Sequence, residues 1–220
     1  TLMRSSAASD VYKRQTMLKG LKLHTHNITA VVTVADDGGS SGILRSDLGM
    51  LAPGDVRNCV SALAEVDPVM GELLNFRFKD GSLKGHSLGN LFLAALNETS
   101  SSFDEAVKKF SHLAGVVGTV YPVTNESVTL SALLEDGRLI EGESHIGVHH
   151  DGPKNGIVKL MVNPEKPKAV DGVIKALEKA DIIVLGPGSL YTSIIPNLLV
   201  DGVVDAIKKS NAVKIYVCNI

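Results

Sequence analysis

The sequence predicts an α/β fold, in which a Rossmann-like parallel sheet has helices on both faces and includes a mainly antiparallel β excursion. Strand-like runs of Val, Ile and Leu alternate with helix-like segments over much of the chain, which is typical of parallel sheets with crossover helices. Between residues 116 and 163, strand-like runs follow one another instead. Aromatic residues make up only 4% of the chain and Trp is absent, so we expect a mainly aliphatic core.

The first half of the chain is expected to form one strand and several helices. A short helix at 16–23 precedes a β-branched strand at 28–34. Asp67-Pro68 is a typical helix start, and Ser102 with Glu105 forms a capping-box pattern. The expected later helices are 55–64, 68–76, 87–97 and 106–113.

The second half is expected to contain the β excursion and then a return to alternation. Asp136-Gly137 is typical of a tight hairpin turn between two short strands. Strands of the excursion are expected at 116–120, 128–134, 139–140 and 157–162. The alternation then resumes with helix 170–179, strand 182–185, helix 203–209 and strand 214–218.

The composition argues against several classes of protein. A net charge of −2 provides no basic surface for nucleic acid, and no Lys/Arg block indicates a membrane patch. The apolar stretch 182–200 is interrupted by glycines and prolines, so we expect no membrane span. Cys59 and Cys218 lie far apart without metal-binding spacing, which fits a reducing cytoplasm. The oligomeric state is left open, including a homo-oligomer.

Residues 1–15 are expected to form a non-native, disordered tail that packs on nothing. The stretch "SSAASDVYKRQ" lacks apolar periodicity and resembles the in-frame translation of a transposase adapter used in sequencing libraries. Residues 16–220 would then form a single incomplete Rossmann-like domain, with the β excursion at about 116–163.

Two loops are candidate binding elements, because ligands of parallel α/β sheets bind beyond the carboxyl ends of strands. The first, Asp36–Gly42, follows the strand 28–34 and combines acids with small residues: Asp36, Asp37, Gly38, Gly39, Ser40 and Ser41. The second, Gly186–Asn197, follows the strand 182–185 and offers Gly186, Gly188, Ser189, Tyr191 and Thr192. Its alternative interpretation is a plain Gly-Pro turn. We expect both loops to lie side by side at one sheet edge.

Two further motifs carry polar residues near helix starts. "PGDVRN" places Asp55, Arg57 and Asn58 there, and Arg57 could bind a phosphate through two hydrogen bonds; the alternative is a plain N-cap beside a solvated Arg. "GHSLG", with His86 and Ser87, matches the nucleophile elbow of serine hydrolases, which requires a strand immediately before it. The polar segment 79–84 precedes it instead. We therefore expect Ser87 to cap a helix beside Asn90.

The polar motifs of the β excursion carry weaker signals. "HIGVHHDG" at 145–152 contains three histidines and is expected to be a solvated loop, since no spacing of Cys or Glu supports zinc. "TNES", which includes Asn125, is a turn by pattern alone. No metal site is expected from these residues.

Five ordered motifs together resemble one family. "ITAVVTVADDGGSSG", "PGDVRN", "GHSLGN", "TNES" and "GPGSLYTSIIPNLLV" are similar to the gluconeogenesis-factor branch of the 2-phospho-L-lactate transferase-like family. The resemblance runs from about Thr16 to Ile220. It departs at the start, because the family begins with a strand and a Gly-rich loop where residues 1–15 stand here.

The resemblance implies a cytoplasmic protein that binds a UDP-sugar or related nucleotide and regulates carbon metabolism and cell shape. It also adds Asn125 to the candidate ligand-binding residues. The alternative is a transferase of the sister branch, which uses a nucleotide diphosphate donor with Mg²⁺. A nucleotide-sugar would explain the acids beside anion-binding amides, because carboxylates suit hydroxyls or Mg²⁺ while amides suit phosphates. The alternative is that one acid only caps the loop.

Overall fold

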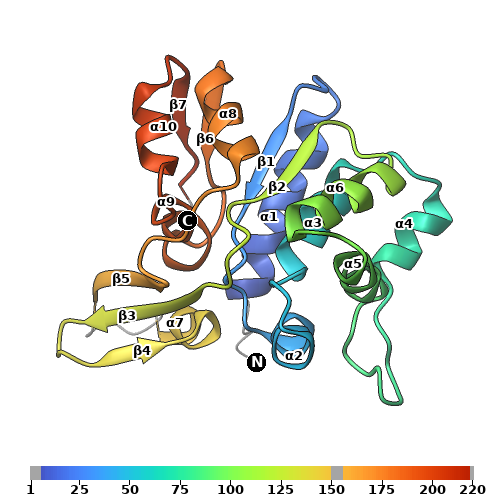
Figure 1. The fold of residues 1–220 in the computed structure, drawn as a ribbon, viewed down its shortest axis with the longest axis horizontal. Helices are drawn as coiled ribbons and strands as arrows, with labels where there is room; N and C mark the ends of the chain where they lie inside the picture. Colours follow the sequence, from blue (N-terminus) through green and yellow to red (C-terminus); the bar gives the residue numbers. More distant parts are fainter. Residues whose placement is uncertain (1–5, 150–155, 219–220) are drawn as a thin grey trace.

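The computed structural model describes residues 6–149 and 156–218, in which helices pack around two pairs of parallel strands and a separate antiparallel sheet (Figure 1). The predicted α/β class is confirmed. The two parallel pairs are β1 (Thr29–Val32) with β2 (Thr119–Pro122), and β6 (Ile182–Leu185) with β7 (Val213–Tyr216).

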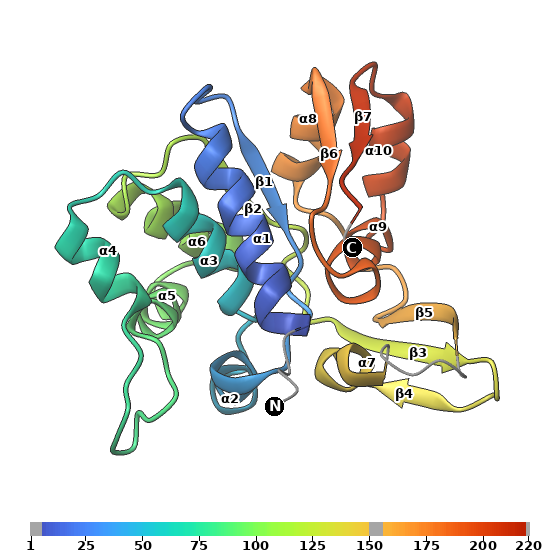
Figure 2. The ribbon, with the colours of Figure 1, turned by 180° about the vertical axis from the view of Figure 1, so that it is seen from behind.

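Most of the helices of the first half gather around β1 and β2. Their bounds are α1 Ser6–Leu21, α2 Gly39–Leu48, α3 Gly54–Leu63, α4 Pro68–Asn75, α5 Leu88–Glu98 and α6 Phe103–Leu113. Figure 2 shows α1 running along the strand pair beside α3. The shared core is mainly aliphatic, as expected, with Phe103 and Phe110 as its fully buried aromatic residues within the described ranges.

The elements around β6 and β7 form a second, smaller core. α8 (Asp171–Lys179) and α10 (Val203–Lys209) pack together, and a π-helical turn, η1 (Leu190–Ile194), leads into α9 (Ile195–Leu198). Val173, Val200 and Val203 are buried between these elements. Other apolar side chains of the strand pair remain exposed, including Ile182 and Val213, so one side of this pair is not covered.

The two parallel pairs are separated rather than joined in one sheet. A groove of about 770 Å³ lies between them, lined by residues of β1 and β6 and by mainly apolar side chains from α1, α8 and α10. β1 hydrogen-bonds only to β2 and β6 only to β7 within the described residues. The strand edges that face the groove are therefore open, because paired strands must lie within about 5 Å of each other.

The expected first strand of the β excursion, 116–120, was assigned wrongly, because Thr119–Pro122 form β2 and pair in parallel with β1. The later strands of the excursion fold as predicted into an antiparallel sheet. Its order is β4 (Leu139–Glu141), β3 (Thr129–Leu134) and β5 (Ile157–Asn163), with an irregularity between Leu133 and Leu134. A second expectation was wrong, because part of the histidine segment forms α7 (Glu143–His149) instead of a loop. His150 and the residues up to 155 lie outside the described part.

The prediction that residues 1–15 pack on nothing was wrong for its last residues. Residues 6–15 are helical and belong to α1, because no Gly or Pro interrupts the helix before the predicted start at Thr16. Arg14 then pairs with Asp55 at 3.1 Å and donates to Ser193 Oγ at 3.1 Å. Residues 1–5 lie outside the described part.

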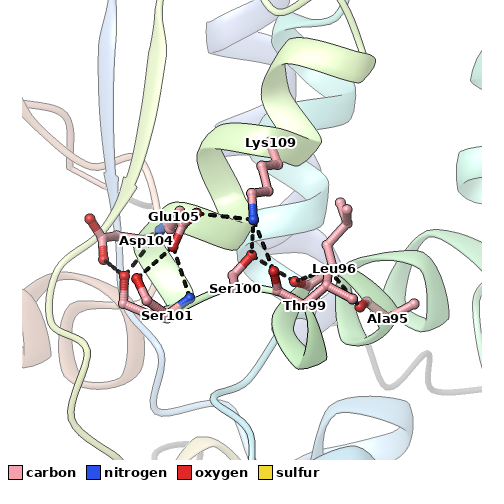
Figure 3. A network of polar contacts seen from close by, with 9 residues as sticks. Ala95, Leu96, Thr99, Ser100, Ser101, Asp104, Glu105 and Lys109 are labelled. Carbon is pink, nitrogen blue, oxygen red and sulfur yellow. Dashed lines mark hydrogen bonds and ion pairs between the residues drawn. The ribbon is translucent and has the colours of Figure 1, made fainter.

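The polar contacts at the start of α6 test the predicted capping box of Ser102 and Glu105 (Figure 3). Ser102 Oγ accepts from Glu105 N, as the capping-box pattern predicts. The Glu105 carboxylate, however, accepts from the N–H and hydroxyl of Ser101 rather than from Ser102, and it also pairs with Lys109 at 3.0 Å. The predicted cap at Ser102 is thus present, and only the reciprocal contact of Glu105 is shifted by one residue, to Ser101.

Candidate functional site

A polar pocket of about 210 Å³ lies at the carboxyl ends of β1 and β6, beside the N-termini of α2 and α3. Figures 1 and 2 both place α2 and α7 at this end of the molecule. The lining residues are Asp36, Gly38, Gly39, Ser40, Ser41, Gly54, Asp55, Arg57, Asn58, Arg77, Asn90, Glu143, Thr192 and Ser193. Residues of both predicted loops therefore line one pocket, with Asn90 beside them, but the second loop contributes only Thr192 and Ser193, and the two strands that precede the loops belong to separate sheets and not to one sheet edge.

The two aspartates of the loop after β1, Asp36 and Asp37, make different contacts. Asp36 lines the pocket, accepts from Gly38 N at 2.9 Å and from the Ser41 hydroxyl, and burial raises its pKa above the ordinary value. Asp37 does not line the pocket. Its carboxylate instead accepts from the backbone N–H groups of Glu143 and Ser144, each at 2.9 Å, and so caps α7.

Close backbone packing shapes this side of the pocket. Gly54 N donates to Ser41 Oγ at 3.2 Å, and a Cβ on Gly54 would lie 2.5 Å from that oxygen and 2.9 Å from Asp36 Oδ2. The N-terminus of α2 also points at the pocket, since Gly39 begins the helix and residues 38–41 line the cavity. The first-turn N–H groups of a helix favour an anion.

Arg57 provides a buried positive charge on the opposite side. The residue is only 8% exposed, and its guanidinium donates to the amide oxygens of Asn90 at 3.1 Å and Asn75 at 2.9 Å. Burial, followed by repulsion from Arg77, lowers the Arg57 pKa to about 10. None of the ion pairs formed within the described residues involves Arg57. The pocket therefore presents a cation whose hydrogen-bond partners are neutral.

A buried hydrogen-bond chain fixes the floor of the pocket. Asn90 uses its oxygen for Arg57, so its Nδ2 donates to Ser40 Oγ at 3.1 Å. Ser40 Oγ also shares a hydrogen bond of 3.0 Å with His86 Nδ1. Together these bonds hold three elements in one rigid arrangement.

The geometry around Ser87 does not fit a nucleophile elbow. Ser87 is fully buried, and its Oγ accepts from Asn90 N at 3.2 Å as the N-cap of α5. The segment before it forms turns and an isolated bridge between Arg77 and Ser87, not a strand of the parallel sheet. Ser87 thus supports the position of Asn90, as the cap prediction expects.

Several predicted residues lie away from the pocket. Asn125 binds the start of α6, where it accepts from Asp104 N at 3.0 Å and donates to Asp104 Oδ1 at 2.7 Å. Ser189 caps the π-helical turn by accepting from Thr192 N. Asn125, Gly186, Gly188, Ser189 and Tyr191 are not among the lining residues, so a ligand role for these five stays a prediction.

Glu143 is the main pocket residue that the sequence analysis missed. Burial raises its pKa to about 7, and Asp36, Asp55 and Asp37 add to this by repulsion, whereas a hydrogen bond from Thr192 opposes it. No local pattern marks the residue, since its link to Asp37 spans 106 positions. Gly54 and Arg77 were also missed as pocket residues, whereas Ser193 lies in the loop Gly186–Asn197 that the sequence did predict.

Two further observations limit the kinds of site in the described part of the chain. No group of three or more His, Cys, Asp or Glu side chains there has a metal-binding arrangement. A role for Mg²⁺ brought by a ligand stays a prediction. No described helix combines the length and apolar character needed to cross a membrane.

Comparison with known proteins identifies the family. The family model described as 2-phospho-L-lactate transferase CofD matches residues 14–220. A relative from Thermoanaerobacterium thermosulfurigenes that bears a gluconeogenesis-factor name is 57% identical, over 93% of this chain and 64% of its own length. The gluconeogenesis factor of Bacillus subtilis is 46% identical, over 93% of this chain and 63% of its own length.

A solved structure of similar sequence has the same fold. The crystal structure of protein BH3568 from Bacillus halodurans superposes with a TM-score of 0.90 at 45% identity, covering 94% of this chain and 66% of that one. The chain spans 64%, 46% and 44% of the length of three of the sequence relatives it matches, and therefore less than two thirds of each. On the family model, the sequence relatives and this fold, the chain belongs to the 2-phospho-L-lactate transferase CofD family, in its gluconeogenesis-factor branch.

Proposed function

We propose that the pocket binds a nucleotide-type ligand, most specifically a UDP-sugar, and that the protein is a cytoplasmic regulator of carbon metabolism and cell shape. The observation that carries the proposal is the buried Arg57 guanidinium, whose hydrogen-bond partners are neutral amides and which lies near a second cation, Arg77. An anion would balance both charges and accept charge-assisted hydrogen bonds.

The remaining lining suits the other parts of such a ligand. The N-terminus of α2 supplies backbone N–H groups for a phosphate, and Asp36, Asp55 and Glu143 supply carboxylates for hydroxyls. A volume of about 210 Å³ is smaller than a site that encloses a drug-sized ligand. We therefore expect the pocket to hold the diphosphate and neighbouring hydroxyls, with the rest of the ligand extending outward.

Calorimetric titration with UDP-N-acetylglucosamine tests the proposal. Arg57→Met should weaken binding by roughly tenfold to a hundredfold, because losing a charge-assisted hydrogen bond costs about 1.5–3 kcal/mol. Arg138→Met is the matched control, since Arg138 is exposed and pairs with Asp136 in the distant hairpin. Equal affinities of the Arg57 variant and the wild type would contradict the proposal.

A transferase is the second candidate, favoured by the family description and by a carboxyl group whose pKa near 7 suits proton transfer. Turnover separates the two candidates. A regulator leaves the UDP-sugar intact during a long incubation, whereas a transferase releases free nucleotide once its acceptor is added. Nucleotide release measured by chromatography would promote the transferase.

A further inference from the structure

Glu143, the first residue of α7, is the residue of the β excursion that lines the pocket. Gly142 precedes it with a φ of +96°, and a Cβ there would lie 2.7 Å from Asp37 Oδ2. Asp37 holds the backbone of Glu143 from the loop after β1, and Thr192 hydrogen-bonds its carboxyl group from η1. Two segments that are distant in sequence, the loop after β1 and η1, therefore fix Glu143 in place at the pocket wall.

The charges that face Glu143 are mostly negative. Asp36 and Asp37 lie on the loop after β1, and Asp55 lies on α3. Asp55 is paired with Arg14 of α1, and in α7 itself the Nδ1 of His145 is engaged with the carbonyl of Glu141. These carboxylates and partial burial together raise the Glu143 pKa to about 7. Near neutral pH the Glu143 carboxyl is therefore part protonated and part ionised.

The same pocket contains the cations that would attract an anion. Arg57 and Arg77 both line it, together with Glu143, whereas Arg45 of α2 donates to the carbonyls of Asp36 and Val128 and does not line the pocket. An anion drawn to Arg57 would enter a small cavity that also holds Glu143. Ionised Glu143 would repel it, and protonated Glu143 could donate a hydrogen bond to it.

We propose that Glu143 couples anion binding in this pocket to proton uptake, so that a phosphate-bearing ligand binds best when Glu143 is neutral. The inference rests on the proposed anion-binding function and adds its regulation by pH. Binding raises the proton affinity of Glu143, and by linkage deprotonation of Glu143 weakens binding. A rise of one pKa unit in the complex would weaken binding by up to tenfold above about pH 7.

The test is titration of UDP-N-acetylglucosamine between about pH 6 and 8.5. Each phosphate of this probe is a diester-type group without the second ionisation near pH 6 that terminal phosphates show, so the charge of its diphosphate stays constant over the range. We expect the wild-type Kd to rise about fivefold to tenfold over this range. Glu143→Gln should bind tightly at every pH. Glu141→Gln is the matched control, because Glu141 is exposed on neighbouring β4, and it should keep the wild-type slope.

A flat wild-type profile, or a slope that persists in Glu143→Gln, would overturn the inference. Inorganic sulfate, whose charge is constant over the same range, separates this failure from failure of the proposed ligand. If the nucleotide-sugar does not bind but sulfate binds with the slope that depends on Glu143, the nucleotide-sugar proposal fails and the coupling stands. If neither probe binds at any pH, both proposals are refuted.

Discussion

Replacing Gly54 with Ala should destabilise the protein, because the structure leaves no room for a Cβ at this position. The new carbon would lie 2.5 Å from Ser41 Oγ and 2.9 Å from Asp36 Oδ2, and Ser41 is only 4% exposed. Moving Ser41 aside would break the hydrogen bond from Gly54 N. Overpacking of a buried site costs about 1–3 kcal/mol, from which the better helix propensity of Ala subtracts less than about 1 kcal/mol.

Gly71→Ala is the matched control for this substitution. Gly71 is partly buried in α4, and a Cβ there would meet nothing within 4 Å. Its replacement should therefore stabilise the protein by about 0.5–1 kcal/mol, through helix propensity alone.

Urea unfolding of the two variants and the wild type measures the difference in free energy of unfolding. We expect Gly54→Ala to lie about 1–2 kcal/mol below the wild type and Gly71→Ala above it. In a thermal melt, each kcal/mol corresponds to about 2–4 °C for a chain of this size. If Gly54→Ala were as stable as Gly71→Ala, the close contact between α2 and α3 would be refuted.

Four further outcomes are expected. Asp37→Ala should lower the free energy of unfolding by about 0.5–2 kcal/mol, and Asp37→Asn by less, because Asn preserves most of a helix cap; equal losses in denaturant titrations would contradict capping. Asp36→Asn should weaken UDP-N-acetylglucosamine binding by roughly tenfold or more without changing stability, and calorimetry showing unchanged or tighter binding would exclude a ligand role. The pKa of Glu143 in the folded protein is about 7, above its ordinary value of 4.5. The protonated Glu143 of the wild type therefore contributes its full share to the free energy of unfolding below about pH 4.5, and this contribution is lost as the pH rises through 7. Glu143→Gln avoids that loss, and its advantage in urea unfolding should grow to roughly 1–2 kcal/mol by pH 8 after solvent screening; a constant advantage would disprove the shift. Finally, the open strand edge beside Ile182, which is 58% exposed, is a surface on which copies of the chain could pair, and Ile182→Lys should weaken any such pairing because charged edges resist it; light scattering that shows the same association in the variant and the wild type would rule out this edge as a contact.

Several features of the site could be predicted from the sequence because they depend on near neighbours. The strand ending before Asp36 and the strand ending before Gly186 mark two loops that both contribute residues to the pocket, although the two strands belong to separate sheets. Ser87 caps α5 through Asn90, three residues later, which a local pattern can indicate. Arg57 sits in the first turns of a helix whose start was also expected.

Other features were missed or misassigned because they depend on contacts between distant residues. Asp37 was expected at the ligand, but its carboxylate caps α7, which the histidine-rich pattern did not predict. The structural role of Asn125 was also missed, because its hydrogen bonds join it to Asp104 at the start of α6, 21 positions away. The helix at residues 6–15 was missed. These residues show little apolar periodicity, and the prediction relied on that and not on the absence of a helix-breaking residue.

The sequence by itself determined the α/β class, the alternation of strands and helices, and the loops that carry the polar residues. Apolar periodicity, caps and turns set these features over a few residues, where the backbone geometry is largely local. Only the tertiary structure decided that β1 and β6 belong to separate pairs, and that Glu143 joins Asp36 and Arg57 in one pocket. Strand pairing and the burial of charges depend on how segments far apart in the chain pack against each other, and a local pattern does not contain that information.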